Sequence, residues 1–500
     1  MKRAITLAAV LLAPNVGLAN DFIDTRLTWT FGDDDVLTRT AETAPPSPLP
    51  RIGDRPGYEL FFDNLDTRYS GRENVGHLVL YKKLAGFVPG LVTEAGLVGL
   101  YIPGVGISDD GSYIKVAYTG RPDRPDDGVG LTLFPFTTNR FQLGYLYDIS
   151  WGGDAIFPNA SGPAPGAKLQ LDMGPGYYFL GLKTASISVP IETVSGSDTD
   201  VEIVRVEETQ YAVLGGGGWD FTPSLRLDVG GGYFQQGRFD LVGVRGLPVY
   251  TFGGSMRLVL HQGIDVGTSV DFKLYRNDPE VPYTFGSREE YVPGRFSWSL
   301  SVEGSLLEQH LSDPEDADAT LLQPAYATAL QLKVKYGYMR GSVIGFFRNL
   351  EYILRNVPSF VPFEGLPSEA TARPELFTAL TLDYHYARAR LTPGIMGGVQ
   401  FPATFASTVS EGSLEASRTL VIRQEGDFDI LPPGKKELPI IGARGSLRWD
   451  LSDILSSYFF VQYVHDPNAT RLVADPGSGT RRIFQRADQL GLGLTVQARY

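Results

Sequence analysis

Apolar and polar residues alternate along most of the chain, in runs separated by turns and loops. In residues 295–303, for example, Phe296, Trp298, Leu300 and Val302 alternate with polar or charged residues. A period of two places successive side chains on opposite faces of a β-strand. The same alternation recurs at 23–31, 141–149, 167–173, 224–229, 266–274, 330–336, 380–386 and 441–451. The pattern predicts an all-β protein without long helices.

The length of the runs favours one all-β architecture over another. A water-soluble sandwich needs only short strands with polar outer faces, whereas runs of about ten residues match tilted strands that cross a bilayer. Aromatic residues, which prefer the membrane interface, occur near the ends of runs at Trp29, Tyr336, Tyr384, Trp449 and Tyr463. Strands can cross a bilayer only in a closed barrel, because closure pairs every backbone group. We therefore predict a transmembrane antiparallel up-and-down β-barrel with an even number of strands, about 18 to 22.

The N-terminal residues have a different pattern. Lys2 and Arg3 precede an apolar run at 4–13, and small residues follow up to Ala19. This three-part arrangement is typical of a secretory signal peptide. We predict a signal peptide over 1–19, cleavage after Ala19, and a single barrel domain over 20–500.

Composition excludes several classes of function. The chain has 44 Lys and Arg against 57 Asp and Glu, a net charge of −13, and no Cys. Proteins that bind nucleic acid rely on neutralising phosphates, so no nucleic-acid partner is expected. Without cysteine, the chain forms no disulfide, Cys-ligated metal centre or thiol nucleophile. No cofactor is predicted.

Catalytic motifs are missing from the sequence. The chain has five His, and neither a GxSxG nor an HExxH motif occurs. Acidic groups at 33–35 and 315–318 have the oxygen ligands that divalent ions prefer, but Asp beside Gly is also ordinary in turns. The sequence does not decide whether these loop carboxylates bind ions. We predict that the protein is not an enzyme and has no metal site.

Alternation also predicts which side chains line the interior. The predicted lumen-lining residues are Lys168, Asp172, Arg226, Asp228, Lys333, Lys335, Asp383, His385, Arg444 and Arg448. They carry both signs of charge, whereas a ring of one sign would indicate ion selectivity. A polar interior in a barrel of this size favours a water-filled channel.

One stretch departs from the period of two. Leu350, Ile353, Leu354 and Val357 follow the spacing i, i+3, i+4, i+7 of an amphipathic helix. We interpret 347–372 as an insert, lumenal or periplasmic, whose short helix narrows the pore or lies on the membrane surface. An irregular strand end is the alternative.

The same region breaks the expected alternation of loop lengths. Counting strands from both ends places 307–324 and 350–375 on the periplasmic side, although both are long. Either one strand between 306 and 400 is miscounted, or these segments are periplasmic inserts.

The last eleven residues, LGLGLTVQARY, alternate up to a terminal aromatic residue. Leu494, Val496 and Tyr500 resemble the C-terminal signal of Gram-negative outer-membrane β-barrel proteins. That resemblance implies the barrel-assembly machinery as a partner. The chain as a whole resembles porin-like outer-membrane barrels, without matching a particular subfamily. TonB-dependent transporters fit poorly, because their plug domain precedes the barrel whereas alternation here starts at Ile23.

This resemblance implies a place in the Gram-negative outer membrane, surrounded by lipid and lipopolysaccharide. We predict a porin-like channel for passive or loop-gated passage of small hydrophilic solutes. The alternative is the outer-membrane component of an envelope-spanning assembly for polysaccharide export, secretion or surface motility. Periplasmic partners would then bind 307–324 and 350–375.

Overall fold

A computed structural model provides the fold. It describes residues 23–33, 35–37, 51–52, 75–102, 106–109, 111–120, 127–138, 143–146, 149–152, 164–194, 201–264, 266, 294–354, 363–368, 371–411, 414–422, 428–452, 454–475 and 479–499. The predicted signal peptide, its cleavage site, Val357 and Tyr500 lie outside these residues.

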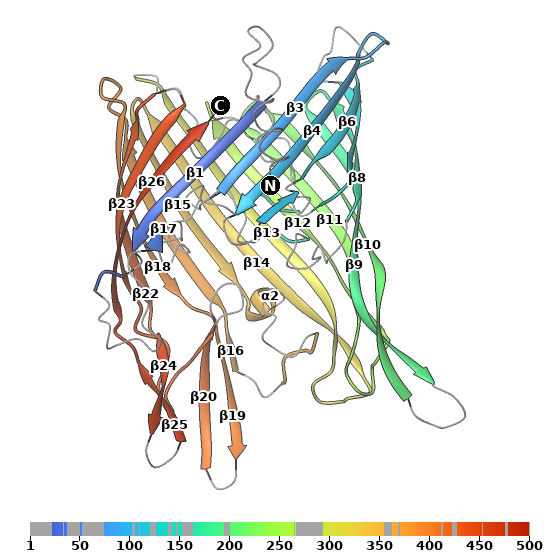
Figure 1. Ribbon diagram of the computed structural model, residues 1–500, viewed down its shortest axis with the longest axis vertical. Coiled ribbons are helices and arrows are strands. Elements are labelled where there is room, and N and C mark those ends of the chain that lie inside the picture. The colour runs from blue at the N-terminus through green and yellow to red at the C-terminus, as the bar shows by residue number, and fades with distance from the viewer. Residues whose placement is uncertain are drawn as a thin grey trace, which may run out of the picture.

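Most of the described strands form one large antiparallel sheet that closes on itself (Figure 1). Its wall strands are β1 (Ile23–Asp33), β3 (Val75–Ala85), β4 (Leu91–Ile102), β6 (Tyr113–Tyr118), β7 (Gly128–Phe134), β8 (Gly166–Met173), β9 (Gly176–Val194), β10 (Val201–Thr222), β11 (Leu225–Arg238), β12 (Pro248–Gln262), β13 (Phe296–Ser312), β14 (Thr320–Tyr336), β15 (Met339–Arg348), β17 (Glu375–Tyr384), β18 (Leu391–Phe401), β22 (Ile440–Asp450), β23 (Leu455–His465) and β26 (Asp488–Arg499). Two further strands of the 20-stranded sheet, β2 (Arg51–Ile52) and β5 (Gly106–Asp109), each pair with one neighbour only.

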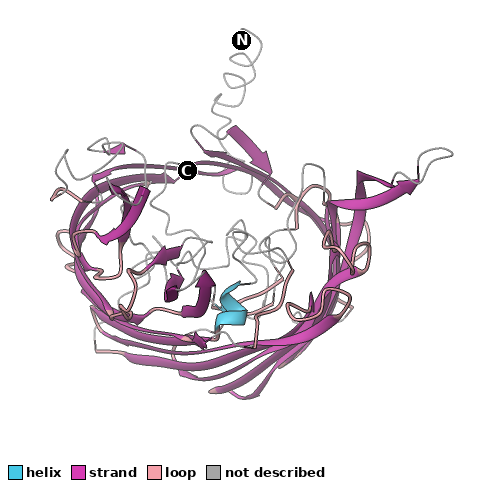
Figure 2. Cartoon of the chain, turned by 90° about the horizontal axis from the view of Figure 1, so that it is seen from below, coloured by secondary structure: helices cyan, strands magenta, loops and turns pink. Residues whose placement is uncertain are grey.

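Closure is made by the first and last wall strands. β1 pairs with β3 on one side and with β26 on the other, from Arg26↔Arg499 to Asp33↔Leu492. Each of the eighteen described wall strands thus has two antiparallel neighbours, and Figure 2 shows the ring that results. The prediction of an antiparallel barrel with an even strand number is confirmed, at the lower end of the expected range.

Connections at the two ends of the barrel differ in length. Both ends of the wall's chain, Ile23 and Arg499, lie at one end, here called the terminal end. Most connections at the terminal end are short, such as 174–175, 223–224 and 337–338. The opposite end, here called the loop end, carries the longer connections 135–165, 349–374, 402–439 and 466–487.

Some of these longer connections contain further secondary structure. The connection 349–374 holds the helix α2 (Leu350–Leu354) and β16 (Thr371–Arg373), and 466–487 holds the hairpin β24 (Thr470–Asp475) and β25 (Gly479–Phe484). β19 (Thr404–Glu411), β20 (Leu414–Ile422) and β21 (Phe428–Ile430) lie in 402–439 and form a four-stranded sheet with β16, here called the outer sheet.

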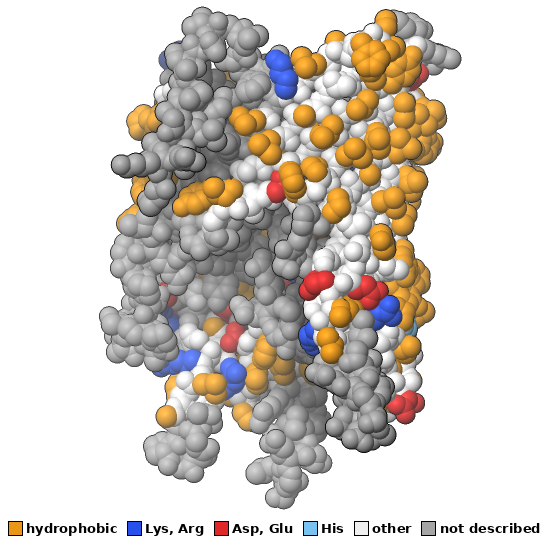
Figure 3. Space-filling view, turned by 45° about the vertical axis from the view of Figure 1, so that its right-hand side comes forward, with side chains coloured by type: hydrophobic (Ala, Val, Ile, Leu, Met, Phe, Trp, Pro, Cys, Tyr) orange, Lys and Arg blue, Asp and Glu red, His pale blue; other side chains and the backbone are white. Residues whose placement is uncertain are grey.

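The outer face of the wall is apolar. On β14, Tyr326, Leu330 and Tyr336 point outward and are 44%, 45% and 53% exposed, while alanines between them point inward. Figure 3 shows hydrophobic side chains, in orange, spread over the outer surface of the barrel wall. Ten residues separate the two tyrosines, which is about 33 Å along a strand, or about 25 Å of height at a tilt of about 40°. That height matches the apolar band of a transmembrane barrel, about 25 Å between two aromatic girdles.

The strand pattern gives the end of the barrel at which two segments lie, which alternation left open. Residues 307–324 comprise the end of β13, the connection 313–319 and the start of β14, and this connection lies at the loop end. The segment 350–375 connects β15 to β17 at the same end. Both segments therefore lie at the loop end, and the alternative of inserts at the terminal end does not agree with the strand pattern.

Two strands that alternation predicted, at 141–149 and 266–274, do not appear among the described wall strands. Residues 143–146 and 149–152 form no wall strand, because β7 pairs directly with β8 from Phe134↔Gly166 onward. The predicted strand at 141–149 is therefore wrong. β12 likewise pairs directly with β13, and the predicted strand at 266–274 lies almost entirely outside the described residues.

In the described part of the chain, no helix is long and apolar enough to cross a membrane.

Candidate constriction inside the barrel

Part of the connection 135–165 lies inside the ring, against the inner face of β9 to β13. Its described residues 143–146 and 149–152 are here called the inner segment. Leu143 and Trp151 pair with each other through two backbone hydrogen bonds of 2.9 Å, which close the segment into a loop. Leu143, Ile149 and Trp151 are almost completely buried. A polar connection exposed to water would not bury these side chains, so the wall must provide an apolar surface.

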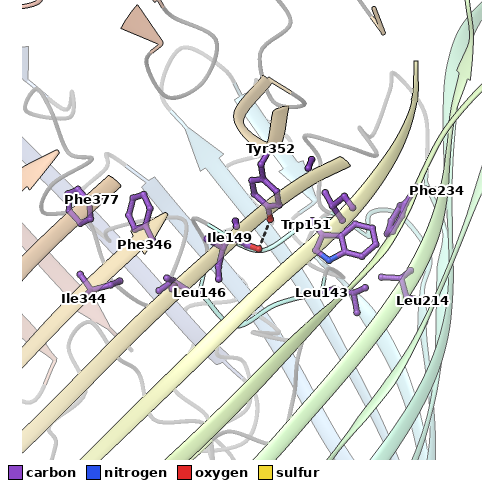
Figure 4. Packing of buried hydrophobic residues seen from close by; sticks show 14 of the residues in the cluster. Leu143, Leu146, Ile149, Trp151, Leu214, Phe234, Ile344, Phe346, Tyr352 and Phe377 are labelled. Atoms are coloured by element: carbon purple, nitrogen blue, oxygen red, sulfur yellow. Dashed lines mark hydrogen bonds between the residues drawn. The ribbon is translucent and has the colours of Figure 1, made fainter. Parts of the chain in front are cut away.

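That apolar surface comes from several strands. Figure 4 shows Leu143 and Trp151 beside Leu214 and Phe234. The Trp151 and Phe234 rings have centroids 5.2 Å apart. Glycine allows the close approach, because a Cβ atom on Gly230 of β11 would lie 2.8 Å from the Leu143 side chain. Gly230 and Gly232 of β11 therefore leave space for Leu143 of the inner segment.

Polar side chains of the wall bind the backbone of the inner segment. The Glu303 carboxylate on β13 accepts hydrogen bonds from the backbone N–H groups of Tyr145, at 2.7 Å, and Leu146, at 3.1 Å. Ser305 Oγ donates to the carbonyl oxygen of Ile149 at 2.8 Å. Lys183 Nζ on β9 donates to the carbonyl oxygen of Gly152 at 2.6 Å. Buried backbone groups of an irregular segment are thereby satisfied, which fixes the segment to the wall.

A buried group of charges lies beside these contacts. Asp228 on β11 forms ion pairs with Arg226, at 2.9 Å, and Arg257, at 2.8 Å. Arg226 also pairs with Asp220 at 3.0 Å. Asp228 and Arg226 side chains are 0% and 2% exposed. Together Asp220, Arg226, Asp228 and Arg257 are here called the charge cluster; the shared Asp228 compensates two buried guanidinium groups.

Tyr145 connects the charge cluster to the inner segment. The Arg257 guanidinium lies 3.1 Å from the centroid of the Tyr145 ring, an arrangement that cation–π attraction favours. The Tyr145 hydroxyl lies 2.7 Å from that of Tyr177, which donates to Asp228 at 3.3 Å. Burial raises the pKa of the Tyr145 hydroxyl well above its ordinary value, while Arg257 acts in the opposite direction. Tyr145 is therefore a neutral partner at physiological pH.

The predicted helix exists and lies inside the ring, where Figure 2 shows it. Its predicted apolar residues Leu350 and Ile353 are buried, with Leu354 beside them, but they pack on residues of the connection 402–439. Tyr352, on another side of α2, is 0% exposed and donates its hydroxyl to the carbonyl oxygen of Ile149 at 2.5 Å (Figure 4). The predicted apolar stripe therefore does not face the inner segment, and Tyr352 does.

The predicted lumen-lining residues are distributed over the whole inner wall. Lys168, Arg226, Asp228 and Arg444 are buried on inward positions of their strands. Lys333 and Lys335 occupy inward positions of β14 near the terminal end. Arg226 and Asp228 belong to the contacts around the inner segment. The ten residues are spread over β8, β11, β14, β17, β22 and the turn 385–390, so they do not form one site.

Four of the others, Asp172, Asp383, His385 and Arg448, have partners close by in the sequence or on a neighbouring strand. Asp172 accepts a hydrogen bond from Gln170 at 2.7 Å, Asp383 pairs with Arg340 at 2.7 Å, and Arg448 pairs with Asp450 at 2.7 Å. His385 is in the turn between β17 and β18, with Nδ1 2.9 Å from Thr392 Oγ1. Burial lowers the pKa of the His385 imidazole, with Asp450 acting in the opposite direction. Among the described residues, no three His, Asp or Glu side chains are placed to share a metal ion.

Comparison with known proteins gives similarity at the level of solved structures. No protein-family model matches the chain, and no curated protein matches it either. The chain is similar to OccK3 (OpdO) of Pseudomonas aeruginosa, with 10% identity, 96% of each chain covered and a TM-score of 0.43. It is similar to OprD of Pseudomonas aeruginosa, with 10% identity over 97% of this chain and 95% of that chain, at a TM-score of 0.39. An anion-selective porin from Comamonas acidovorans is 8% identical over 96% of this chain and 98% of its own, at a TM-score of 0.39.

Proposed function

We propose that the protein is an outer-membrane channel through which small hydrophilic solutes pass passively. One observation carries this proposal. The wall is a closed ring of eighteen described strands whose outer face is apolar and whose inner face carries buried charged side chains. Barrels of about 16 to 18 strands are wide enough to leave an aqueous channel. The inner segment narrows that channel, because the wall fixes it inside the ring through Lys183, Glu303 and Ser305.

The surroundings of the channel follow from the same proposal. A barrel with an apolar band of this height belongs in the outer membrane of a Gram-negative bacterium, in contact with lipid and lipopolysaccharide. Leu494 and Val496 lie on β26, the strand that closes the ring with β1. We propose that the barrel-assembly machinery recognises this strand.

The scaffold alternative loses its main support. It needed 307–324 and 350–375 as contact surfaces at the periplasmic end, which is the terminal end of an outer-membrane barrel. Both segments belong to the loop end instead. The channel is therefore the function we retain.

Single-channel recording in a planar bilayer tests the channel. Near the two ends of the connection 135–165, the backbone N–H of Ala164 donates a hydrogen bond of 2.7 Å to the carbonyl oxygen of Phe136. In a variant in which Asn-Gly replaces 137–163, a two-residue hairpin turn thus joins β7 to β8 and the wall strands are unchanged. We expect stable conductance steps from the wild type and larger steps from this variant. In a matched control, Asn-Gly replaces 195–200 between the paired residues Val194 and Val201, and its conductance should equal that of the wild type. A folded wild-type barrel that does not conduct would contradict the proposal.

A further inference from the structure

The helix α2 contacts two parts of the molecule that are far apart in the sequence. Leu350 and Ile353, which are 1% and 5% exposed, pack against Ala403 and Ile422 next to the outer sheet. Tyr352 belongs instead to the large apolar cluster that contains the inner segment. A helix of five residues thus has the outer sheet on one side and the inner segment on another.

α2 is itself held by the wall. Asn349 caps its first turn, because its side-chain oxygen accepts the backbone N–H of Tyr352 at 3.1 Å. The same oxygen accepts the backbone N–H of Tyr326 on β14 at 2.9 Å. Gln309 on β13 donates to the carbonyl oxygen of Glu351 at 3.2 Å. The position of the Tyr352 side chain is therefore set by β13 and β14.

The Tyr352 hydroxyl is shared between two carbonyl oxygens of the inner segment. It donates to Ile149 at 2.5 Å and lies 3.3 Å from the oxygen of Ser150. The Ile149 oxygen also accepts from Ser305 Oγ of the wall. Two donors, one from α2 and one from β13, thus meet at one buried carbonyl group.

We propose that Tyr352 is the positioning residue of the constriction, and that the packing of α2 against the outer sheet determines how firmly Tyr352 holds the inner segment. This rests on the proposed channel function. When the Tyr352 contact is loosened, Ser305, Lys183 and Glu303 still attach the inner segment to the wall. The segment then stays inside the barrel but fluctuates about its position, so the width of the constriction varies. A change in the outer sheet acts on the pore through Ile353 and Tyr352 of α2.

The test combines single-channel recording with amide hydrogen exchange. Tyr352→Phe removes the hydroxyl and keeps the buried ring, so the barrel keeps its packing. We expect a larger mean conductance, more current fluctuation in the open level, and faster exchange of the inner-segment amides. Tyr336→Phe is the matched control, since Tyr336 is on the outer face and 53% exposed, and it should leave both measurements unchanged.

Ile353→Ala tests the connection to the outer sheet. It should raise the conductance and the amide exchange rate, as Tyr352→Phe does. If both residues act through one contact, the changes in the double variant should be smaller than the sum of the changes in the two single variants. Additive changes would overturn the role of the outer sheet. If Tyr352→Phe has wild-type conductance and wild-type exchange, the positioning role is overturned. If the wild type does not conduct, the channel function is contradicted, and amide exchange alone then decides the role of Tyr352.

Discussion

Asp228 compensates two buried guanidinium groups, so its charge should matter for stability. Asp228→Asn keeps the shape but leaves Arg226 and Arg257 without their shared carboxylate. Removing one partner of a buried ion pair typically costs about 3–5 kcal/mol. We expect a lower urea midpoint for unfolding of the refolded barrel. Asp220→Asn is the control, because Asp220 is 38% exposed, and it should cost about 1 kcal/mol or less. Equal effects of both substitutions would contradict this account of the charge cluster.

Gly218 on β10 gives the charge cluster its space. A Cβ atom there would lie 2.1 Å from Asp228 Oδ1 and 2.8 Å from Arg226 Nη2. Gly218→Ala should therefore destabilise the barrel by about 1–3 kcal/mol through overpacking. Gly445→Ala is the matched control, because a Cβ atom at Gly445 of β22 meets nothing within 4 Å. Comparing the urea midpoints of the two variants measures the effect, and equal midpoints would argue against a steric role for Gly218.

At this scale, the sequence predicts the face of a side chain better than its partner. Alternation placed Arg226 and Asp228 on the lumen face, and the structure has both on inward positions. It did not identify Tyr352 or Lys183 as contacts of the inner segment. Their partners are backbone carbonyl oxygens of Ile149 and Gly152, which are distant in the sequence and carry no side-chain signature.

At the scale of elements, long strands were predictable and the inner segment was not. The wall strands follow a period of two because one face meets an apolar surrounding and the other the interior. The residues around Leu143 and Tyr145 alternate similarly, but Leu143 and Leu146 are both buried by the inner wall. A segment that folds inward can bury every side, so alternation alone does not distinguish it from a strand. The helix α2 was predictable because its period differs from two.

Ring closure makes a specific prediction about β1 and β26. Phe31 and Leu494 are directly opposite each other in this pairing, and opposite residues of antiparallel strands have Cα atoms about 4.5–5.5 Å apart, within disulfide range. Since the chain has no Cys, the double variant Phe31→Cys, Leu494→Cys should form one intramolecular disulfide, seen as a shift in gel mobility that reductant reverses.

Phe31→Cys with Leu490→Cys is the control for this cross-link. Leu490 is four residues further along β26, about 13 Å away at about 3.3 Å per residue, and should form no intramolecular disulfide. If the first pair does not cross-link in the folded protein, the ring is not closed by β1 and β26.

At the scale of the whole molecule, apolar side chains occur in two places, on the outer face of the wall and in a cluster inside the ring. Trp449 is on the outer face and 48% exposed, whereas Trp151 is 1% exposed and packs inside the ring. Brominated lipid quenches tryptophan fluorescence on contact. In single-tryptophan variants, with the other four of the five Trp replaced by Phe, Trp449 should be strongly quenched by brominated lipid and Trp151 should not. We expect this difference because the apolar side chains on the outer face of a transmembrane barrel contact lipid, whereas those inside the ring contact other protein groups. Strong quenching of Trp151 would place the inner segment at the lipid surface, and the constriction that we propose would then be wrong.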